Sequence, residues 1–345
     1  MTKGPAYALA AAALFGASTP LAKMLLGTTD PVALAALLYL GSGAGLALYR
    51  LVVRGRDTTT ARLGRTDVKW LAAAIVLGGV IAPVLLLQGL SKSSGSTASL
   101  LLNSEGVLTA LLAWFMFREN FDRRIAAGMA AIAAGAVVLS WGGDASFSTG
   151  AIAIVAACAC WALDNNLTRH ISAADPVAIA MWKGLVAGTV NAAIAFARGA
   201  ELPDARFLVA GALLGLASYG VSLSLFVSAL REVGTARTGA YFSTAPFIGA
   251  VLSVLVLHEE VSARLLIAGC LMVLGVWLHL TERHTHEHTH EALLHTHVHP
   301  HDEHHQHEHT PDDPADEPHS HAHLHEAVTH EHDHHPDIHH RHDHR

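Results

Sequence analysis

Ionisable and amide side chains stand inside long apolar runs of this chain, where they can bind a proton or a polar solute. Glu105 interrupts one run and is preceded by Asn103. Asp164 and Asn165 stand in a second run, and Lys183 stands in a third. Charges at membrane depth are costly and are seldom kept without a partner or a water-filled path. We interpret Glu105 as a candidate for substrate binding or proton coupling; the alternative is a carboxylate held by a neighbouring helix or kept neutral by burial.

Asp164 and Lys183 lie at similar distances from the ends of their runs, so their side chains could pair. Such a pair would be structural if the two charges only neutralise each other. It would be functional if a substrate or a proton breaks it. Two tryptophans nearby, Trp161 and Trp182, are expected to be interfacial or lipid-facing anchors.

Three prolines interrupt apolar runs and could open the backbone of a helix. Pro20 follows Ser18 and Thr19, whose hydroxyls can satisfy the carbonyls that a proline frees. Pro83 and Pro246 stand in two other runs. Each could be a hinge or expose carbonyls to a cavity, and the alternative is a kink that improves packing. The accompanying polar residues favour function for Pro20 and Pro246, whereas a kink alone is favoured for Pro83.

For the other polar residues a structural role is the favoured interpretation. Lys23, at the end of the first run, is expected to extend to the membrane interface. A polar group within residues 207–230 could line a cavity, although hydrogen bonding between helices is the favoured alternative: Ser218, Tyr219, Ser222, Ser224 and Ser228.

The composition places most of this chain in a membrane. Of its 345 residues 51% are hydrophobic and 15% are charged. A soluble domain needs about a quarter charged residues, so the surface must face a lipid bilayer. No nucleotide-binding loop, nucleophile elbow or metal-hydrolase motif is present, which argues against an enzyme, and nothing indicates a nucleic-acid partner.

Apolar runs of spanning length, about 20 residues, predict ten transmembrane helices. The predicted ranges are residues 6–26, 32–53, 68–90, 97–117, 125–141, 150–169, 177–197, 207–230, 235–257 and 265–280.

An internal repeat divides these helices into two sets of five. Residues 30–35 (DPVALA) return as residues 175–180 (DPVAIA), and a second similarity aligns Leu90 with Leu230 and Glu119 with Glu259. We predict repeats over residues 4–142 and 150–281. Because five is odd, the second repeat must enter the membrane from the opposite side, and such inverted repeats are typical of secondary carriers.

The distribution of basic residues predicts the orientation. Lys and Arg gather in the loops on one side, most densely in residues 50–69. The positive-inside rule makes this side cytoplasmic. We therefore predict a multi-pass protein of the cytoplasmic (inner) membrane with both termini in the cytoplasm.

These features together resemble the drug/metabolite transporter superfamily, specifically its EamA-type members. The likeness covers residues 4–281 and includes the glutamates that close the fourth and ninth helices (Glu119 and Glu259) and Ala245-Pro246 in the ninth. The resemblance implies a secondary carrier, often an exporter of amino acids or other small metabolites, with a central cavity between the halves. The chain departs from it at Glu105-Gly106, which stand in the fourth helix where the ninth carries Pro246.

The last segment, residues 282–345, has a different character. It holds 24 of the 27 histidines, interleaved with Asp and Glu, and its lack of apolar residues predicts disorder. Alternating imidazoles and carboxylates suit Zn, Ni or Co ions. The alternatives are a pH response and a solvated extension without a role. The candidate metal ligands are His284, His286, His288, His290, His339, His340, His342 and His344.

The leading hypothesis is an all-α secondary transporter that exports a small organic metabolite by alternating access, with a tail that binds divalent metal. A transporter of a transition-metal ion or a metal chelate is the second hypothesis, although no histidine cluster lies within the apolar runs. A non-transporting, metal-responsive membrane protein is the third. No cofactor is required, and the sequence leaves open a homodimer.

Overall fold

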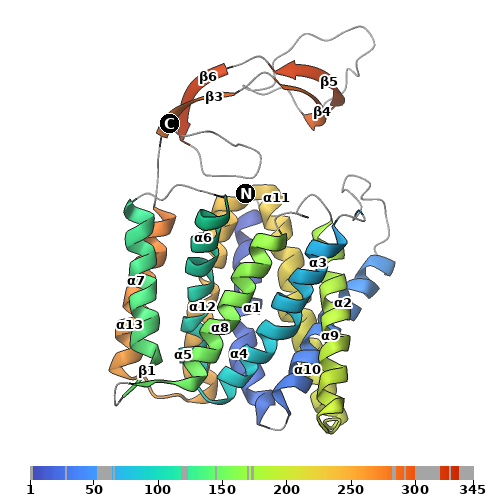
Figure 1. The fold of residues 1–345 in the computed structure, drawn as a ribbon, viewed down its shortest axis with the longest axis vertical. Helices are drawn as coiled ribbons and strands as arrows, with labels where there is room; N and C mark the ends of the chain where they lie inside the picture. Colours follow the sequence, from blue (N-terminus) through green and yellow to red (C-terminus); the bar gives the residue numbers. More distant parts are fainter. Residues whose placement is uncertain are drawn as a thin grey trace. The chain divides into compact units, whose positions relative to one another are not determined.

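The structure is a computed structural model (Figure 1). It describes residues 3–27, 29–52, 64, 67–117, 123–143, 146–168, 171, 175–281, 285–290, 293–299, 319–325 and 328–333. The chain forms two units, Met1–Thr281 and Glu282–Arg345, and each is described by itself.

The repeated six-residue stretch begins the second helix of each repeat. These helices are α2 (Pro31–Val52) and α9 (Pro176–Ala197). Asp30 and Asp175 each accept a hydrogen bond from the backbone N–H two residues further on, at 2.8 Å and 2.9 Å. Aspartate at the N-cap followed by proline in the first turn is a strong helix-start signal, because the carboxylate satisfies a free N–H and proline lacks one. The repeat therefore encodes the same helix start twice.

Helices α2 and α9 cross closely because glycines face each other. A Cβ atom added at Gly184 would lie 2.7 Å from Cα of Gly43, so a larger residue would push the backbones apart. Small residues at crossings are how helices associate in lipid, where apolar burial gives no driving force.

The third span contains a π-helical segment. This segment is η1 (Ile75–Ile81), and it joins α3 (Val68–Ala74) to α4 (Ala82–Ser91). Pro83 lies in the first turn of α4, directly after the irregularity. The kink predicted at this proline is therefore a widened turn that ends beside it.

The eighth span has the same feature at the matching place. Here η3 (Leu216–Val221) joins α10 (Ala205–Gly215) to α11 (Ser222–Phe242). The repeat alignment that places Leu90 on Leu230 also places Ile81 on Val221, so both π-helical segments end at the same position of their repeats.

Helix α11 includes the reversal between the eighth and ninth spans. The rings of Phe226 and Phe242 have centroids only 4.9 Å apart. Sixteen residues of straight helix would separate them by about 24 Å. The chain must therefore turn back between these residues, as the sequence predicted for residues 231–234.

The fourth span is broken, although the sequence predicted a continuous helix. Helix α5 (Gly95–Leu101) ends before Asn103, and α6 (Ser104–Phe117) begins after it. The Asn103 amide donates to the carbonyl of Leu100 at 3.1 Å. An asparagine side chain that bonds its own backbone competes with the helix, which accounts for the break.

The prediction that Pro246 interrupts the ninth helix from within is wrong. Helix α12 (Ala245–Leu257) begins at the preceding residue, so the proline lies in its first turn. There its missing N–H removes no helical hydrogen bond. The helix of this span is interrupted at Ser243 and Thr244, which form a turn between α11 and α12.

The remaining helices are α1 (Gly4–Leu26), α7 (Arg123–Ser140), α8 (Thr149–Thr168) and α13 (Ala263–Leu280). Strands β1 (Trp141–Gly143) and β2 (Ser146–Phe147) form a small antiparallel pair between the repeats. We call the end of the helical unit that carries this pair the distal end, and the end that carries the N-terminus the proximal end (Figure 1).

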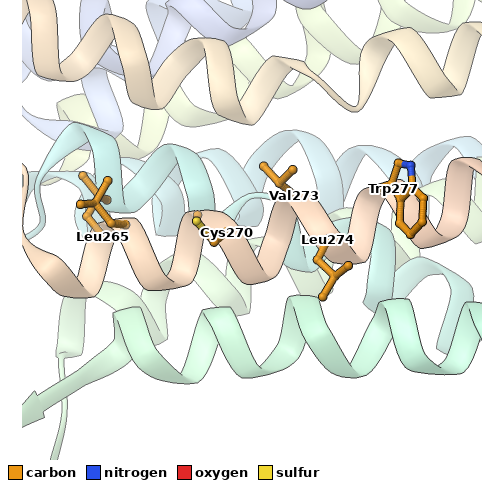
Figure 2. Close-up of a pocket in the computed structure, with 7 residues that line it drawn as sticks. Leu265, Cys270, Val273, Leu274 and Trp277 are labelled. Carbon is orange, nitrogen blue, oxygen red and sulfur yellow. The ribbon is translucent and has the colours of Figure 1, made fainter.

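Helix α13 presents an open apolar groove (Figure 2). All of its lining belongs to this one helix and none of it is charged: Leu265, Leu266, Gly269, Cys270, Val273, Leu274 and Trp277. Such a surface suits lipid chains and offers no partner to a polar solute. It is part of the membrane-facing exterior.

The spans agree with a ten-helix membrane protein. Of the described helical segments, seven are long and apolar enough to cross a membrane, namely Gly4–Leu26, Pro31–Val52, Val68–Ser91, Arg123–Ser140, Thr149–Thr168, Val177–Ala197 and Ala205–Phe226. The shorter apolar pieces α5 with α6, α12 and α13 match the other three predicted spans. Helices α1 and α8, which start the two repeats, run in opposite directions (Figure 1). The repeats are therefore inverted.

The sequence predicted disorder for the histidine-rich unit, whereas the structure has four short strands there. These are β3 (Thr285–His290), β4 (Leu293–His299), β5 (His319–His325) and β6 (Val328–Asp333). Strand β3 pairs with β6, and β4 pairs with β5, both antiparallel. The alternation of histidine with other residues has the two-residue period of a strand, which provides a physical reason for the difference.

Candidate substrate and coupling site

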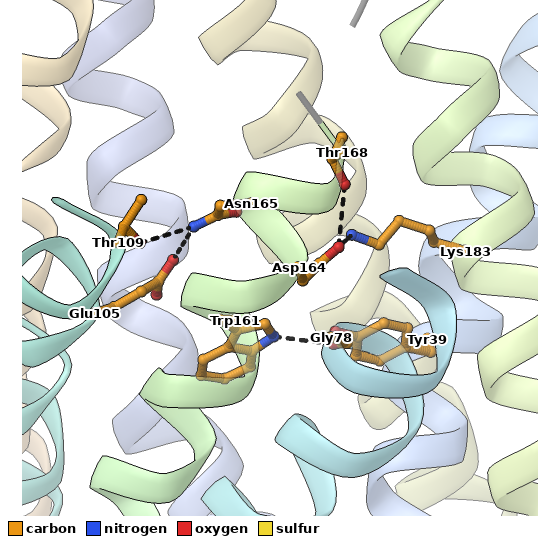
Figure 3. Close-up of polar contacts among 9 residues, drawn as sticks. All are labelled: Tyr39, Gly78, Glu105, Thr109, Trp161, Asp164, Asn165, Thr168 and Lys183. Atoms are coloured by element: carbon orange, nitrogen blue, oxygen red, sulfur yellow. Dashed lines mark hydrogen bonds and ion pairs between the residues drawn. The ribbon is translucent and has the colours of Figure 1, made fainter. Parts of the chain in front are cut away.

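Glu105 joins the broken fourth span to α8. It lies in the first turn of α6, directly after the break, and is half-buried. One carboxylate oxygen accepts a hydrogen bond from the Asn165 amide at 2.9 Å, and this amide also lies 3.5 Å from the Thr109 hydroxyl (Figure 3). Among the described residues, no basic side chain lies within ion-pair distance of Glu105. Its charge is therefore held by a neutral partner.

Asp164 is neutralised by Lys183, as the sequence suggested. The ammonium of Lys183 lies 2.5 Å and 2.8 Å from the two carboxylate oxygens, and the Thr168 hydroxyl donates to the second oxygen at 3.1 Å (Figure 3). The Asp164 side chain is only 4% exposed and that of Lys183 19%. The pair links α8 to α9 within the membrane.

The π-helical segment η1 provides carbonyls that side chains of other helices bind. The carbonyl of Gly78 accepts hydrogen bonds from the Tyr39 hydroxyl at 2.7 Å and from the Trp161 indole at 2.9 Å (Figure 3). The carbonyl of Gly79 accepts one from the Asn191 amide at 3.1 Å. A π-helical turn disturbs the usual i to i−4 pairing, so these carbonyls can bind donors from α2, α8 and α9.

Gly78 also makes room for Asp164. A Cβ atom at this position would lie 1.9 Å from a carboxylate oxygen of Asp164. Neither Gly78 nor Tyr39 was singled out by the sequence, because an apolar run with paired glycines resembles an ordinary packing face. The adjacent glycines Gly78-Gly79 were the available signal.

The interpretation of Trp161 as an interfacial or lipid-facing anchor is wrong. Its side chain is buried and donates to the Gly78 carbonyl. A buried indole needs an acceptor for its N–H, and the π-helical turn supplies one. Trp182, in contrast, is 47% exposed, as expected of a lipid-facing residue.

The candidates of the first span lie near an aromatic group. Ser18, Thr19 and Pro20 are buried within α1. The ring of Tyr219, from η3, lies 5.9 Å from that of Phe15 on α1 and 5.6 Å from that of Tyr39, between centroids. Tyr219 and Phe15 are half-buried. This group therefore connects η3 with α1 and with the Gly78 contacts.

Two other polar candidates have structural contacts. Besides its bond to Leu100, the Asn103 amide lies 3.8 Å from the sulfur of Met272 on α13. The Ser222 hydroxyl donates to the carbonyl of Ala11 on α1 at 2.9 Å, which is the interhelical hydrogen bond favoured for this serine. Pro246 lies in the first turn of α12.

The tail candidates are only partly described. His286, His288 and His290 lie on β3. His284 and the four histidines of residues 339–344 lie outside the described residues, as does Glu119. Strand register places His286 opposite His332 and His288 opposite His330. No group of three or more metal-ligating side chains is found among those that the structure describes.

Among the described residues of this site, Glu105 is an acid without a paired cation. Asp164 and Lys183 cancel, so an ionised Glu105 would leave this region with a net negative charge. In a low-dielectric interior such a charge attracts a proton or a cationic group strongly. The arrangement can thus bind and release positive charge next to a break in a helix.

Ten apolar spans in the described part of the chain, arranged as two inverted repeats with charged residues between them, define a polytopic membrane transporter fold. The chain matches the EamA-like transporter family over residues 2–141 and 148–281, and it belongs to that family. It is 31% identical over 288 residues to an uncharacterized transporter of Methanothermobacter thermautotrophicus, over 78% of this chain and 84% of the relative. A solved crystal structure shares the fold, with a TM-score of 0.61 at 20% identity, over 81% of this chain and 99% of the other.

Family membership therefore makes this chain a membrane transporter and not an enzyme. It also argues against the non-transporting alternative.

Proposed function

We propose that this transporter exports a small organic metabolite by alternating access, with Glu105 as the group that binds a proton or a positively charged part of the substrate. The observation that carries the proposal is the contact set of Glu105. Its carboxylate is half-buried, lies at the broken fourth span and has an amide for a partner. A carboxylate without a paired cation can change its protonation or its partner at lower cost than one in an ion pair.

Asp164 is the weaker coupling candidate. Its carboxylate already has a lysine and a hydroxyl as partners. Taking a proton would require separation of the ion pair and would leave Lys183 as an isolated buried charge, which costs several kcal/mol. We therefore assign a structural role to the pair.

The orientation is part of the proposal. Of the basic residues in the loops, 14 lie on the proximal side of the predicted topology and 5 on the distal side. The positive-inside rule then places the proximal end on the cytoplasmic side of the membrane. Export would proceed from the proximal end to the distal end.

The test starts by finding a substrate. Cells with and without the protein are grown on a panel of amino-acid analogues and metals, and hits are measured as flux in proteoliposomes. Glu105→Gln keeps the size of the side chain and removes its charge. We expect it to abolish proton-coupled flux while the protein remains in the membrane. Glu260→Gln, at an exposed glutamate, is the control. Normal flux in Glu105→Gln would remove Glu105 from the mechanism.

A second candidate function is metal handling, with the tail as a buffer for Zn, Ni or Co. In the strand register His295, His297 and His299 stand opposite His323, His321 and His319. Residues opposite each other in an antiparallel pair, and residues two apart on one strand, share a face of the ladder. Neutral imidazoles are suitable ligands for these ions.

Truncation separates the two functions. A chain ending at Glu282 should bind far fewer equivalents of Zn in equilibrium dialysis than the full chain. Binding to the full chain should fall as the pH drops below about 6.5, because protonated imidazoles do not ligate metal. Equal binding by both chains would contradict the buffer. A metal phenotype that disappears with the tail would make metal the leading cargo, whereas a metabolite phenotype that persists would make the tail accessory.

A further inference from the structure

The distal end holds a set of contacts that the substrate site does not use. Lys23, near the end of α1, does not simply extend to the interface as the sequence suggested. Its ammonium donates to the carbonyl of Leu90 at 2.6 Å and to that of Ser93 at 2.7 Å. These carbonyls belong to the C-terminal end of α4 and the turn after it. A cation at this position suits the negative end of a helix.

Glu259 binds the other side of the same turn. Its two carboxylate oxygens accept hydrogen bonds from the backbone N–H groups of Gly95, at 2.6 Å, and Ser96, at 2.9 Å. These are the first two residues of α5. A residue of the second repeat therefore caps a helix of the first, and an anion at a helix N-terminus is favourable.

The backbone of His258 directs Glu259 toward α5. His258 ends α12 in the left-handed region, with φ of +53°, and it is the one non-glycine residue with positive φ among those described. This conformation is unfavourable for a residue with a Cβ atom. The hydrogen bonds that the next residue, Glu259, makes with α5 offset the cost of this backbone conformation.

The two charged side chains act on one short connection. Lys23 and Glu259 attract each other across the α4–α5 turn, and each binds one end of it. Both are half-buried, so water can reach them and replace their hydrogen bonds. The contacts can therefore form and break as the protein changes conformation.

The turn leads directly to the candidate site. Helix α5 is the distal half of the broken span, and its proximal half, α6, carries Glu105. Helix α5 packs against α1, α12 and α13. Opening of the distal end by movement of α5 would therefore separate α5 from these helices. Fixing the first residues of α5 opposes that separation.

We propose that Lys23 and Glu259 form a releasable latch that keeps the distal end of the transporter closed by holding the α4–α5 turn. They are positioning residues for transport and do not contact the substrate. The proposal rests on alternating access as the mode of transport. Loss of one charge-assisted hydrogen bond shifts an equilibrium by roughly tenfold, so either residue can change the balance between the two states without unfolding the protein.

The test measures accessibility and needs no substrate. Ser99→Cys, in a chain whose Cys158, Cys160 and Cys270 are replaced by alanine, places a thiol on α5 behind the latch. Ser99 is 1% exposed and its hydroxyl has no hydrogen-bond partner, so the replacement removes no bond. Ser42→Cys, at a buried position of α2, reports general loosening. A membrane-impermeant maleimide is added to right-side-out and to inside-out vesicles.

We expect Glu259→Gln and Lys23→Met to raise the rate at which Ser99→Cys is labelled from the distal side about tenfold. The labelling rate of Ser42→Cys should stay unchanged. Lys23→Arg, which keeps the charge, should stay near the native rate. Glu260→Gln alters the neighbouring, exposed glutamate and is the matched control.

Two results would overturn the latch. One is a Ser99→Cys rate in both Glu259→Gln and Lys23→Met that equals the rate in Glu260→Gln. The other is an equal rise at Ser42→Cys, which would show that the contacts only stabilise the fold. Because no flux is measured, this result is independent of whether Glu105 carries transport. If Glu259→Gln does not fold, Lys23→Met tests the latch from its other residue.

Discussion

Lys183→Met removes the cation that neutralises Asp164 and keeps a side chain of similar length. Asp164 would then retain the Thr168 hydroxyl as a partner in a position that is 4% exposed. Removing one partner of a buried ion pair costs about 3–5 kcal/mol, because the remaining charge is uncompensated. We therefore expect the free energy of unfolding to fall by about that amount.

The neutral double variant separates the charge effect from packing. Asp164→Asn combined with Lys183→Met leaves an amide in place of the buried carboxylate. Replacing a buried pair by neutral groups of similar volume is often close to neutral in stability. The double variant should thus regain at least half of the stability that the single variant loses. Lys92→Met, at an exposed lysine, is the matched control.

The assay is thermal unfolding of the purified full chain in detergent, followed by tryptophan fluorescence. A loss of 3–5 kcal/mol corresponds to a fall in Tm of roughly 6–20 °C. If Lys183→Met melts within 2 °C of the native chain, Asp164 does not depend on this lysine and the reasoning is refuted. A double variant less stable than the single one would also refute it.

Two further predictions concern stability and use the same measurement. Gly78→Ala should be strongly destabilising, because its Cβ would lie 1.9 Å from a carboxylate oxygen of Asp164, whereas Gly106→Ala meets nothing within 4 Å and should be tolerated; equal Tm values would contradict this. Arg50→Ala breaks a partly exposed ion pair of 3.2 Å with Asp175 and should cost less than about 1 kcal/mol. Asp175→Ala should cost about 1 kcal/mol more, because it also removes the cap of α9; an equal or smaller loss would be inconsistent with that cap.

Much of the architecture could be predicted from local patterns. A run of about 20 apolar residues makes all its backbone hydrogen bonds within itself as a helix in lipid. Each span can therefore be predicted from its own sequence. The repeated Asp-Pro start has a local cause as well, since the cap and the helix it begins are neighbours in the chain. Inversion of the second repeat then follows from an odd number of spans.

The breaks in the spans were less predictable. The polar residues around Asn103 interrupt an apolar run, but the sequence predicted that the helix continues through them. The π-helical segments η1 and η3 lie in runs that read as ordinary helices. The widened turn of η1 accepts hydrogen bonds from donors on other helices, such as Tyr39 and Trp161, and those donors are far away in the sequence.

The sequence by itself determined which residues are ionisable at membrane depth and roughly how deep they lie, and it suggested that Asp164 and Lys183 pair. Only the tertiary structure decided that Asn165 holds Glu105, that Gly78 accepts two side chains, and that Glu259 caps a helix of the other repeat. Helix period and apolarity are local properties. The partners of a buried polar group are set by how helices cross, and these contacts join residues 39 to 164 positions apart.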